Sequence, residues 1–173
     1  MRKLPKTITK EEFEIIFKAA SKDKRKDKKQ MMLAMLLGFE AGMRISEIVG
    51  LENKIPSLTK DNVDSSSIRI NQGKGKKDRI VPRPKRMNDA ALKLLPLKIQ
   101  RRTLQRYIQK LGFIHLGKHI TFHTLRHGFG SHLAQTRPLH EVQMLMGHSR
   151  LDTTGIYLHA NPKKAIEGAR EVF

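Results

Sequence analysis

The sequence predicts a mainly helical domain of the α+β class that carries one small antiparallel β-sheet of three strands. Apolar residues recur at helical spacing through most of the chain, whereas residues 57–84 change to a spacing of two. Glycine and proline separate the segments. A chain of 173 residues is long enough for one well-packed domain and too short for two of ordinary size. We therefore expect one domain over residues 1–173.

Three helices are expected before the sheet. Thr9 stands three residues before Glu12, which is typical of a capping box at the start of a helix. A second, very apolar helix follows the basic stretch at residues 22–29 and should reach Gly42, where glycine breaks the pattern. A short third helix beyond this break should end at Gly50.

The sheet is expected in the middle of the chain. Ile68 and Ile70 alternate with Arg69, a pattern that places the two isoleucines on one face of a strand. A second strand should begin near Ile80, and the sequence "GKGKK" between the two predicts a hairpin with glycines in its turn. A third strand is expected near residues 58–63.

The rest of the chain predicts further helices. A stripe of apolar residues should end at Gly112, and a helix capped by Thr121 should follow it. The next helix should begin near Pro138 and end at Gly147. Two last segments complete the pattern, a helix with a capping box at Ser149 and Asp152 and an amphipathic helix at residues 161–173.

The composition favours a polyanionic partner. Lysine and arginine number 35 against 16 acidic residues, and the formal charge of +19 makes nucleic acid the first candidate. The longest apolar run, residues 31–39, is about half of the ~20 residues that a membrane span needs, so we expect no membrane partner. The N-terminal residues show no signal-peptide pattern. The absence of cysteine excludes disulfides, thiolate metal sites and a cysteine nucleophile.

The stretch "ITFHTLRHGFGSHLA" is a candidate site for a metal ion or for a phosphate. His123 and His127 have a spacing that fits zinc, but the glutamate of zinc proteases is missing and Arg126 would oppose a dication. His132 falls on the opposite face of a helix. A phosphate fits better, because Arg126 can bind two phosphate oxygens and His123 can exchange a proton near neutral pH. If this stretch binds no ligand, His123 should pack in the core and Arg126 should lie at the surface.

Three other motifs carry candidate residues. Arg44 follows a glycine break in a very apolar segment, where a charge is costly unless an acid such as Glu47 holds it. Lys74 stands between glycines at the expected hairpin tip, where it either enters a groove or belongs to an ordinary basic turn. His148 lies between two expected helices, and Tyr157, nine residues later, is either a packed residue or a reactive one.

In their order along the chain these motifs resemble those of the catalytic domain of tyrosine recombinases of the phage-integrase and Xer type. "GMRISEIVGL" is similar to the first arginine motif of this family, with Arg44 as the arginine and Glu47 as the supporting acid one turn later. "GKGKKDRIVP" is similar to the hairpin lysine motif, with Lys74 as the catalytic lysine. The resemblance extends over roughly residues 5–160.

Two further motifs complete the resemblance. "HTLRHGFGSHL" resembles the H-x-x-R motif, with His123, Arg126 and the flanking His127 in a supporting role. "LMGHSRLDTTGIYLH" resembles the final motif, with His148 at its histidine-or-tryptophan position and Tyr157 as the nucleophile. Each motif alone is weak, but the whole set in the right order is specific.

The resemblance implies the fold of DNA breaking-rejoining enzymes and the site-specific recombination or integration of DNA through a 3′-phosphotyrosyl intermediate. Arg44 and Arg126 would bind the phosphate in place of a metal ion. His123 would take the proton of the tyrosine, while Lys74 would protonate the leaving oxygen and His148 would donate to the phosphate. No metal ion and no nucleotide cofactor is expected. The alternatives are a type IB topoisomerase, which relaxes supercoils with similar residues, and a non-catalytic basic DNA-binding protein.

The expected partner is double-stranded DNA at a recombination site, with a homotetramer on the DNA, a monomer in solution and a location on the nucleoid in the cytoplasm. Family members generally carry an N-terminal core-binding domain, and this chain starts where the catalytic domain normally starts. We therefore expect a lone catalytic domain or a fragment of a longer integrase. The basic loop is either a solvated surface or, like the hairpin, a phosphate contact. The residues expected to contact DNA are Lys24, Arg25, Lys26, Lys28, Lys76, Lys77 and Arg79.

Overall fold

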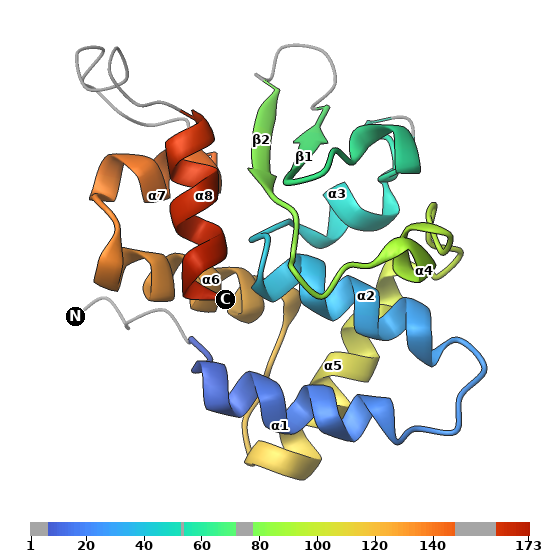
Figure 1. Cartoon of the computed structure of the whole chain (residues 1–173). Coiled ribbons are helices and arrows are strands. Elements are labelled where there is room, and N and C mark those ends of the chain that lie inside the picture. Colours follow the sequence, from blue (N-terminus) through green and yellow to red (C-terminus); the bar gives the residue numbers. More distant parts are fainter. Residues whose placement is uncertain (1–6, 53, 72–77, 148–161) are drawn as a thin grey trace.

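The computed structural model describes residues 7–52, 54–71, 78–147 and 162–173, which form a mainly helical fold with one small sheet (Figure 1). The elements are α1 (Lys10–Ser21), α2 (Lys28–Phe39), α3 (Ile45–Val49), the 3-10 helix η1 (Lys60–Asn62), β1 (Ser67–Ile70), β2 (Arg79–Pro82), α4 (Asp89–Leu92), α5 (Arg101–Leu116), α6 (Phe122–Thr136), α7 (Leu139–Met146) and α8 (Pro162–Val172). The predicted α+β class is confirmed, and the short α4 is an addition to the prediction. The helix predicted at Ser149 and Asp152 lies outside the described residues.

Helix α1 begins at the predicted capping box. The Thr9 hydroxyl accepts a hydrogen bond from the Glu12 amide at 3.2 Å, and the Glu12 carboxylate accepts one from the Thr9 amide at 3.1 Å. The buried Phe13 of α1 stacks on Phe39 of α2, with the ring centroids 4.1 Å apart. These contacts fix α1 against the most buried helix of the domain.

Helix α2 is apolar on nearly all sides because it is the central helix, packed against α1, α3, α4, α5 and α6. It ends at Phe39, short of the predicted end at Gly42. Gly42 instead adopts a φ of +62°, and a Cβ there would lie 2.3 Å from Cδ1 of Phe129. Glycine therefore lets the chain turn toward α3 in direct contact with this ring.

The C-terminal half of the chain follows the predicted order with one changed boundary. Helix α5 continues past its predicted end at Gly112 and stops at Gly117, which has a φ of +61°. Gly112 serves close packing, because a Cβ there would lie 2.5 Å from Cγ1 of Ile120. The predicted limits at Thr121, which caps α6, and at Gly147, which ends α7, are confirmed.

Strands β1 and β2 form the predicted hairpin. They pair antiparallel, with Ile70 opposite Arg79. Ile68 and Ile70 are buried whereas Arg69 is exposed, which confirms the predicted alternation. Strand β2 packs against α7 and α8, and its first residue, Arg79, lies in the candidate site.

The predicted third strand near residues 58–63 is wrong, because the described sheet has two strands. Part of this segment forms η1, and Val63 makes only an isolated bridge to Ile68. The Asn62 side chain accepts hydrogen bonds from the Thr59 amide at 3.0 Å and from the Thr59 hydroxyl at 2.9 Å. Such local bonds from side chain to backbone close a turn and compete with an extended strand.

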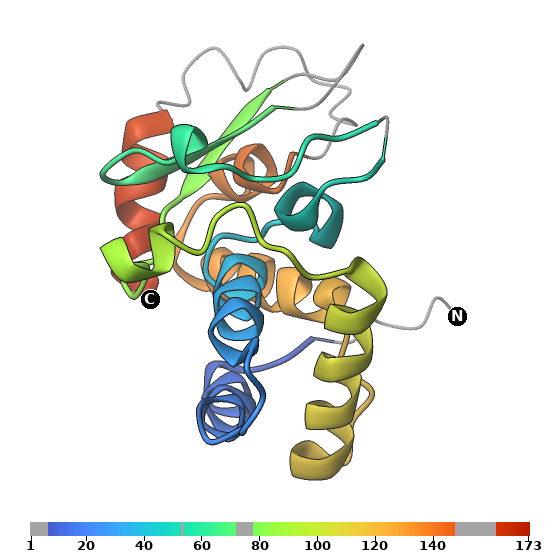
Figure 2. The same cartoon turned by 90° about the vertical axis from the view of Figure 1, so that its right-hand side faces the viewer.

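Figures 1 and 2 show that α1 and the C-terminal part of α5 lie at the end of the molecule away from the hairpin. Helices α7 and α8 lie beside the hairpin, and a small apolar cluster joins them to α6 through Phe129, Leu145 and Ile166. Phe173 packs against Phe39 and Phe129, with centroid distances of 5.5 and 5.9 Å. The end of α8 is thereby fixed to the centre of the domain.

No helix within the described ranges has the length and apolar character that crossing a membrane would require.

Candidate active site

The first part of the site is the pair formed by Arg44 and Glu47 at the start of α3. Arg44 is the N-cap residue, and its amide donates to the Glu47 carboxylate at 2.7 Å. Its guanidinium donates to the same carboxylate at 2.8 Å. The Arg44 side chain is 40% exposed whereas that of Glu47 is 1% exposed. Glu47 therefore holds Arg44, as predicted, and leaves part of the guanidinium open to solvent.

Arg79 lies inside the protein and not on the DNA-contacting surface where we predicted it. Its guanidinium forms two parallel bonds to the Glu47 carboxylate, at 2.6 and 2.9 Å. Its Nε donates to the carbonyl oxygen of Leu145 at 3.1 Å. The cause is the alternation of β2, in which Arg79 and Val81 face inward and Ile80 faces outward.

The Glu47 carboxylate remains ionised because its arginine partners outweigh its burial. Burial raises the pKa of Glu47, whereas the hydrogen bonds and the charge of Arg79, followed by the bonds from Arg44, lower it to about 2. The site therefore contains a permanent negative charge at neutral pH, and this charge organises two arginines.

Arg126 is buried in the second turn of α6 and binds two backbone carbonyls. Its two terminal nitrogens donate to the carbonyl oxygens of Gly42 and Met146. Burial, together with the positive charges of Arg44 and Arg79, lowers the pKa of Arg126. The structure describes no ion pair between Arg126 and a carboxylate among residues 7–52, 54–71, 78–147 and 162–173.

The described part of the site thus holds more positive than negative charge. The positive charges of Arg44 and Arg79 act on Arg126, and the Glu47 carboxylate pairs with Arg44 and Arg79. An anion with several oxygens, such as a phosphodiester, would balance this charge, and its oxygens would match the planar donors of arginine. The geometry therefore favours an anion beside Arg44 and Arg126.

The histidines of α6 separate into two groups. The exposed His123 and the half-buried His127 face each other, with 2.9 Å between their Nε2 atoms. The alternative of a packed His123 beside a surface Arg126 is wrong, because His123 is exposed and Arg126 is buried. His132 packs against Phe39, with ring centroids 5.6 Å apart, and its burial lowers its pKa. Within the described ranges no three histidine or acidic side chains gather in a way that could hold a metal ion.

The basic loop before α2 has two kinds of residue. Arg25 pairs with Asp27 at 2.9 Å and lies over the ring of Tyr107, and Lys28 donates to the Ser21 carbonyl at 3.1 Å. These contacts tie both side chains to neighbouring groups of the protein, although Arg25 remains exposed. Lys24 and Lys26 are exposed, so their ammonium groups are available to a polyanion.

Several predicted residues lie outside the described part of the chain. The hairpin that carries Lys74 is formed, but its tip at residues 72–77 is outside the description. The same is true of residues 148–161, which directly follow α7. The predicted residues in these segments are Lys74, Lys76, Lys77, His148 and Tyr157.

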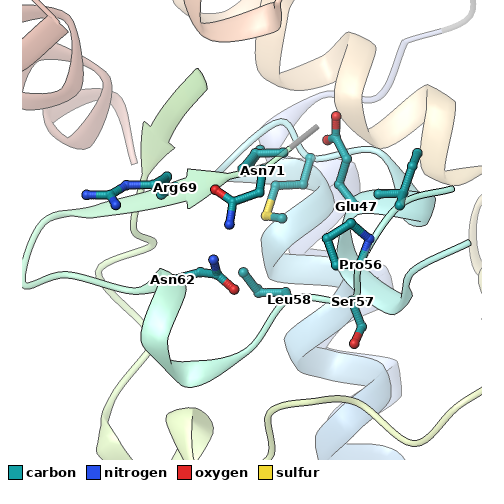
Figure 3. Close-up of a pocket in the computed structure, with 10 residues that line it drawn as sticks. Glu47, Pro56, Ser57, Leu58, Asn62, Arg69 and Asn71 are labelled. Atoms are coloured by element: carbon teal, nitrogen blue, oxygen red, sulfur yellow. The ribbon is translucent and has the colours of Figure 1, made fainter. Parts of the chain in front are cut away.

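A small pocket lies behind the site, between the α3 region and β1 (Figure 3). Glu47, Leu58, Asn62 and Arg69 are among the residues that line it. Its volume of about 10 Å³ is the space of one water molecule, which is too small for a nucleotide. We therefore assign it no substrate.

The sequence did not indicate the backbone groups that hold the arginines, namely the carbonyls of Gly42, Leu145 and Met146. Glycines before Arg44 and after Met146 are the only hint in the sequence, because glycine often marks the end of a helix, where backbone carbonyls lack partners. The residue types do not otherwise predict which backbone carbonyls bind an arginine.

The fold and the site define the class of this protein as a mainly helical α+β domain with one β-hairpin and a cluster of arginines around the buried Glu47. The sequence profile of the phage integrase family matches residues 6–102 and 94–164. The chain belongs to the phage integrase family.

Curated relatives and solved structures agree with this assignment. The tyrosine recombinase XerA of Thermococcus kodakarensis is 34% identical over 90% of this chain and 58% of its own length. The tyrosine recombinase XerC of Thermodesulfovibrio yellowstonii is 31% identical over 96% of this chain and 62% of its own. The chain thus spans about three fifths of these relatives.

Two crystal structures of recombinases share the fold. A crystal structure of XerA recombinase superimposes with a TM-score of 0.65 and 25% identity, covering 96% of this chain and 64% of that one. The crystal structure of the XerH site-specific recombinase bound to its difH substrate, in a pre-cleavage complex, superimposes with a TM-score of 0.66 and 25% identity. The match covers 94% of this chain and 53% of that one.

Proposed function

We propose that this chain is the catalytic domain of a site-specific DNA recombinase that cleaves and rejoins DNA through a 3′-phosphotyrosyl intermediate. The observation that carries the proposal is the cluster in which Glu47 holds Arg44 while Arg126 has carbonyl partners and no described carboxylate. Such a cluster fits the phosphodiester that recombinases cleave. The similarity to XerA and XerC, which are tyrosine recombinases, supports the same activity.

Arg44 and Arg126 act on the phosphate. Both would donate hydrogen bonds to the non-bridging oxygens, which gain negative charge in the pentacoordinate transition state. Their positions are fixed before the DNA binds, by Glu47 and by the carbonyls of Gly42 and Met146. Fixed donors stabilise developing charge without reorganising during the reaction. This arrangement supplies the charge that many nucleases take from a metal ion, so we propose no metal cofactor.

The proton transfers involve residues of three motifs. The Tyr157 hydroxyl attacks phosphorus, and the bond between phosphorus and the 5′ oxygen breaks. His123 is the proposed base, because a phenol with an ordinary pKa of ~10 must lose its proton as the new bond forms. Lys74 would protonate the departing 5′ oxygen, and His148 would donate to a non-bridging oxygen. The new phosphotyrosyl ester retains the energy of the old one, so rejoining needs no nucleotide cofactor.

The proposed partner is double-stranded DNA, on which the domain would act as part of a tetramer. The formal charge of +19 and the exposed Lys24 and Lys26 support binding to a polyanion. Lys76 and Lys77 of the hairpin are proposed to contribute in the same way.

The decisive test is covalent trapping on a nicked DNA substrate from which the cleaved strand diffuses away. We expect an adduct that resists SDS, with Tyr157 as the modified residue in peptide mapping. Tyr157→Phe should bind the same DNA with unchanged affinity and form no adduct. An adduct that persists in this variant would exclude Tyr157 as the nucleophile, and the lack of any adduct with the unaltered protein would favour a non-catalytic DNA-binding protein. Relaxation of supercoiled DNA without strand exchange between two sites would instead indicate a topoisomerase.

A further inference from the structure

Arg79 connects two elements of the site that are distant in sequence. Its side chain is 7% exposed and lies between α3 and the C-terminal end of α7. Through two bonds it holds Glu47, which in turn holds both the amide and the guanidinium of Arg44. Through its Nε it holds the carbonyl of Leu145. No ordinary surface contact would need an arginine buried to this degree.

The end of α7 is held by two arginines. Arg79 binds the carbonyl of Leu145, and Arg126 binds the carbonyl of the next residue, Met146. Carbonyls in the last turn of a helix lack partners within the helix and carry partial negative charge, so guanidinium groups satisfy both demands. The position of this helix end therefore depends on the arginines of the site.

Gly147, which ends α7, also packs directly against the Arg79 side chain. Gly147 has a φ of +59°, and a Cβ at this position would lie 2.7 Å from Cδ of Arg79. The backbone thus touches the aliphatic part of the same side chain that binds Leu145 and Glu47. Gly147 directly precedes His148 in the sequence. Arg79 therefore packs against the residue that immediately precedes His148 in the sequence.

We propose that Arg79 is a positioning residue that couples the phosphate-binding Arg44 to the end of α7, and so sets the start of the segment that carries the nucleophile. Arg79 does not touch the DNA in this role. It acts through Glu47 on one side and through Leu145 and Gly147 on the other. The proposal rests on the recombinase function proposed above, because it assigns to Arg79 a part in the same reaction.

A lysine cannot replace Arg79 in this role. An ammonium group would keep the charge, but it lacks the planar fork that binds both oxygens of Glu47 and the separate Nε donor that binds Leu145. Displacement of reacting groups by about 1 Å can lower a rate by about a hundredfold. Arg79→Lys should therefore slow cleavage by roughly ten- to a hundredfold while leaving the affinity for DNA within about twofold.

The matched control is Arg83→Lys. Arg83 follows β2 closely and also binds backbone carbonyls, donating to Met87 at 2.6 and 3.1 Å and to Asp64 at 3.3 Å. It has no contact with Glu47 or with α7 among these bonds. Both variants and the unaltered protein are compared in single-turnover cleavage of the nicked substrate at saturating enzyme, in DNA affinity and in thermal unfolding.

A measurement without DNA separates this inference from the proposed function. The amide of Gly147 donates within the end of α7, so its hydrogen exchange, followed by NMR, reports whether this end is held. We expect faster exchange at Gly147 in Arg79→Lys and in Glu47→Gln, no further increase in the double variant, and no change in Arg83→Lys. Additive effects in the double variant would show that Glu47 and Arg79 do not act on α7 through one path.

The coupling is refuted if Arg79→Lys cleaves at the unaltered rate, or if Arg83→Lys slows cleavage and loosens Gly147 to the same extent. It is also refuted if the loss of cleavage in Arg79→Lys is matched by an equal loss of DNA affinity. If the unaltered protein forms no adduct, the proposed function fails, and the exchange at Gly147 still decides whether Arg79 couples the two elements.

Discussion

Glu47→Gln tests the energetics of the buried cluster. The Glu47 carboxyl titrates at its ordinary value of 4.5 in an unfolded chain and at about 2 in the fold, and this difference corresponds to roughly 3 kcal/mol of stability. Because the pKa is lower in the fold, the unfolded chain binds more protons between these pH values. The contribution is therefore complete above pH 4.5 and is lost as the pH falls toward 2. Glutamine removes the charge and leaves the buried Arg79 without its ionised partner, so we expect a loss of about 3–5 kcal/mol at pH 7.

The assay is urea unfolding of the unaltered protein and the variant from pH 7 to pH 3. The difference in unfolding free energy should be constant near neutral pH and should shrink by roughly 2 kcal/mol by pH 3. Glu14→Gln is the control, because Glu14 is 48% exposed and pairs with Arg86 at the surface, where an ion pair contributes about 1 kcal/mol or less. A difference between Glu47→Gln and the unaltered protein that does not change with pH would refute the reasoning.

Four further outcomes are expected. Gly42→Ala should destabilise the fold by about 1–3 kcal/mol in urea unfolding, because its positive φ strains alanine and its Cβ would meet Phe129 at 2.3 Å. Arg126→Ala should lower single-turnover cleavage by about a hundredfold or more, and a loss below tenfold would contradict its role at the phosphate. Cleavage should continue in EDTA, and restoration by zinc after inhibition by EDTA would favour the metal interpretation of His123 and His127. DNA affinity measured by fluorescence anisotropy should fall steeply with salt, whereas a flat response would contradict phosphate binding.

Local sequence signals predicted most helix limits in this domain. Thr9 and Thr121 bind amides only a few residues away, and Gly147 adopts a left-handed conformation that its own residue type permits. Such signals depend on neighbours in the chain, so the sequence contains all the necessary information. The failure at Gly112 shows the limit of the same rule, because that glycine accommodates Ile120, and close packing between segments gives no signal in one sequence.

The candidate site was predictable in its residue types and not in its contacts. The motif with Arg44 and Glu47 indicated the first pair correctly, since the two are three residues apart. The basic residues near Arg79 in the sequence predict an exposed position, whereas the pleat of β2 turns its side chain toward Glu47. The carbonyl partners of Arg126 come from segments 84 and 20 residues away. Contacts of this kind follow from the packing of whole helices, which no local pattern describes.

The excess of guanidinium groups around Glu47 has a practical meaning for work with the purified domain. Arg44 and Arg79 pair with one carboxylate in the described cluster while Arg126 lies near both, so the protein carries repulsion among like charges that a bound polyanion would relieve. A polyanion that binds only the native state stabilises it by mass action. Phosphate, sulfate or heparin should then act as a conformational stabiliser during purification and storage, and the melting temperature should rise with oligonucleotide concentration. Under the proposed function, nucleic acid would then be a structural ligand of the domain before it is a reactant.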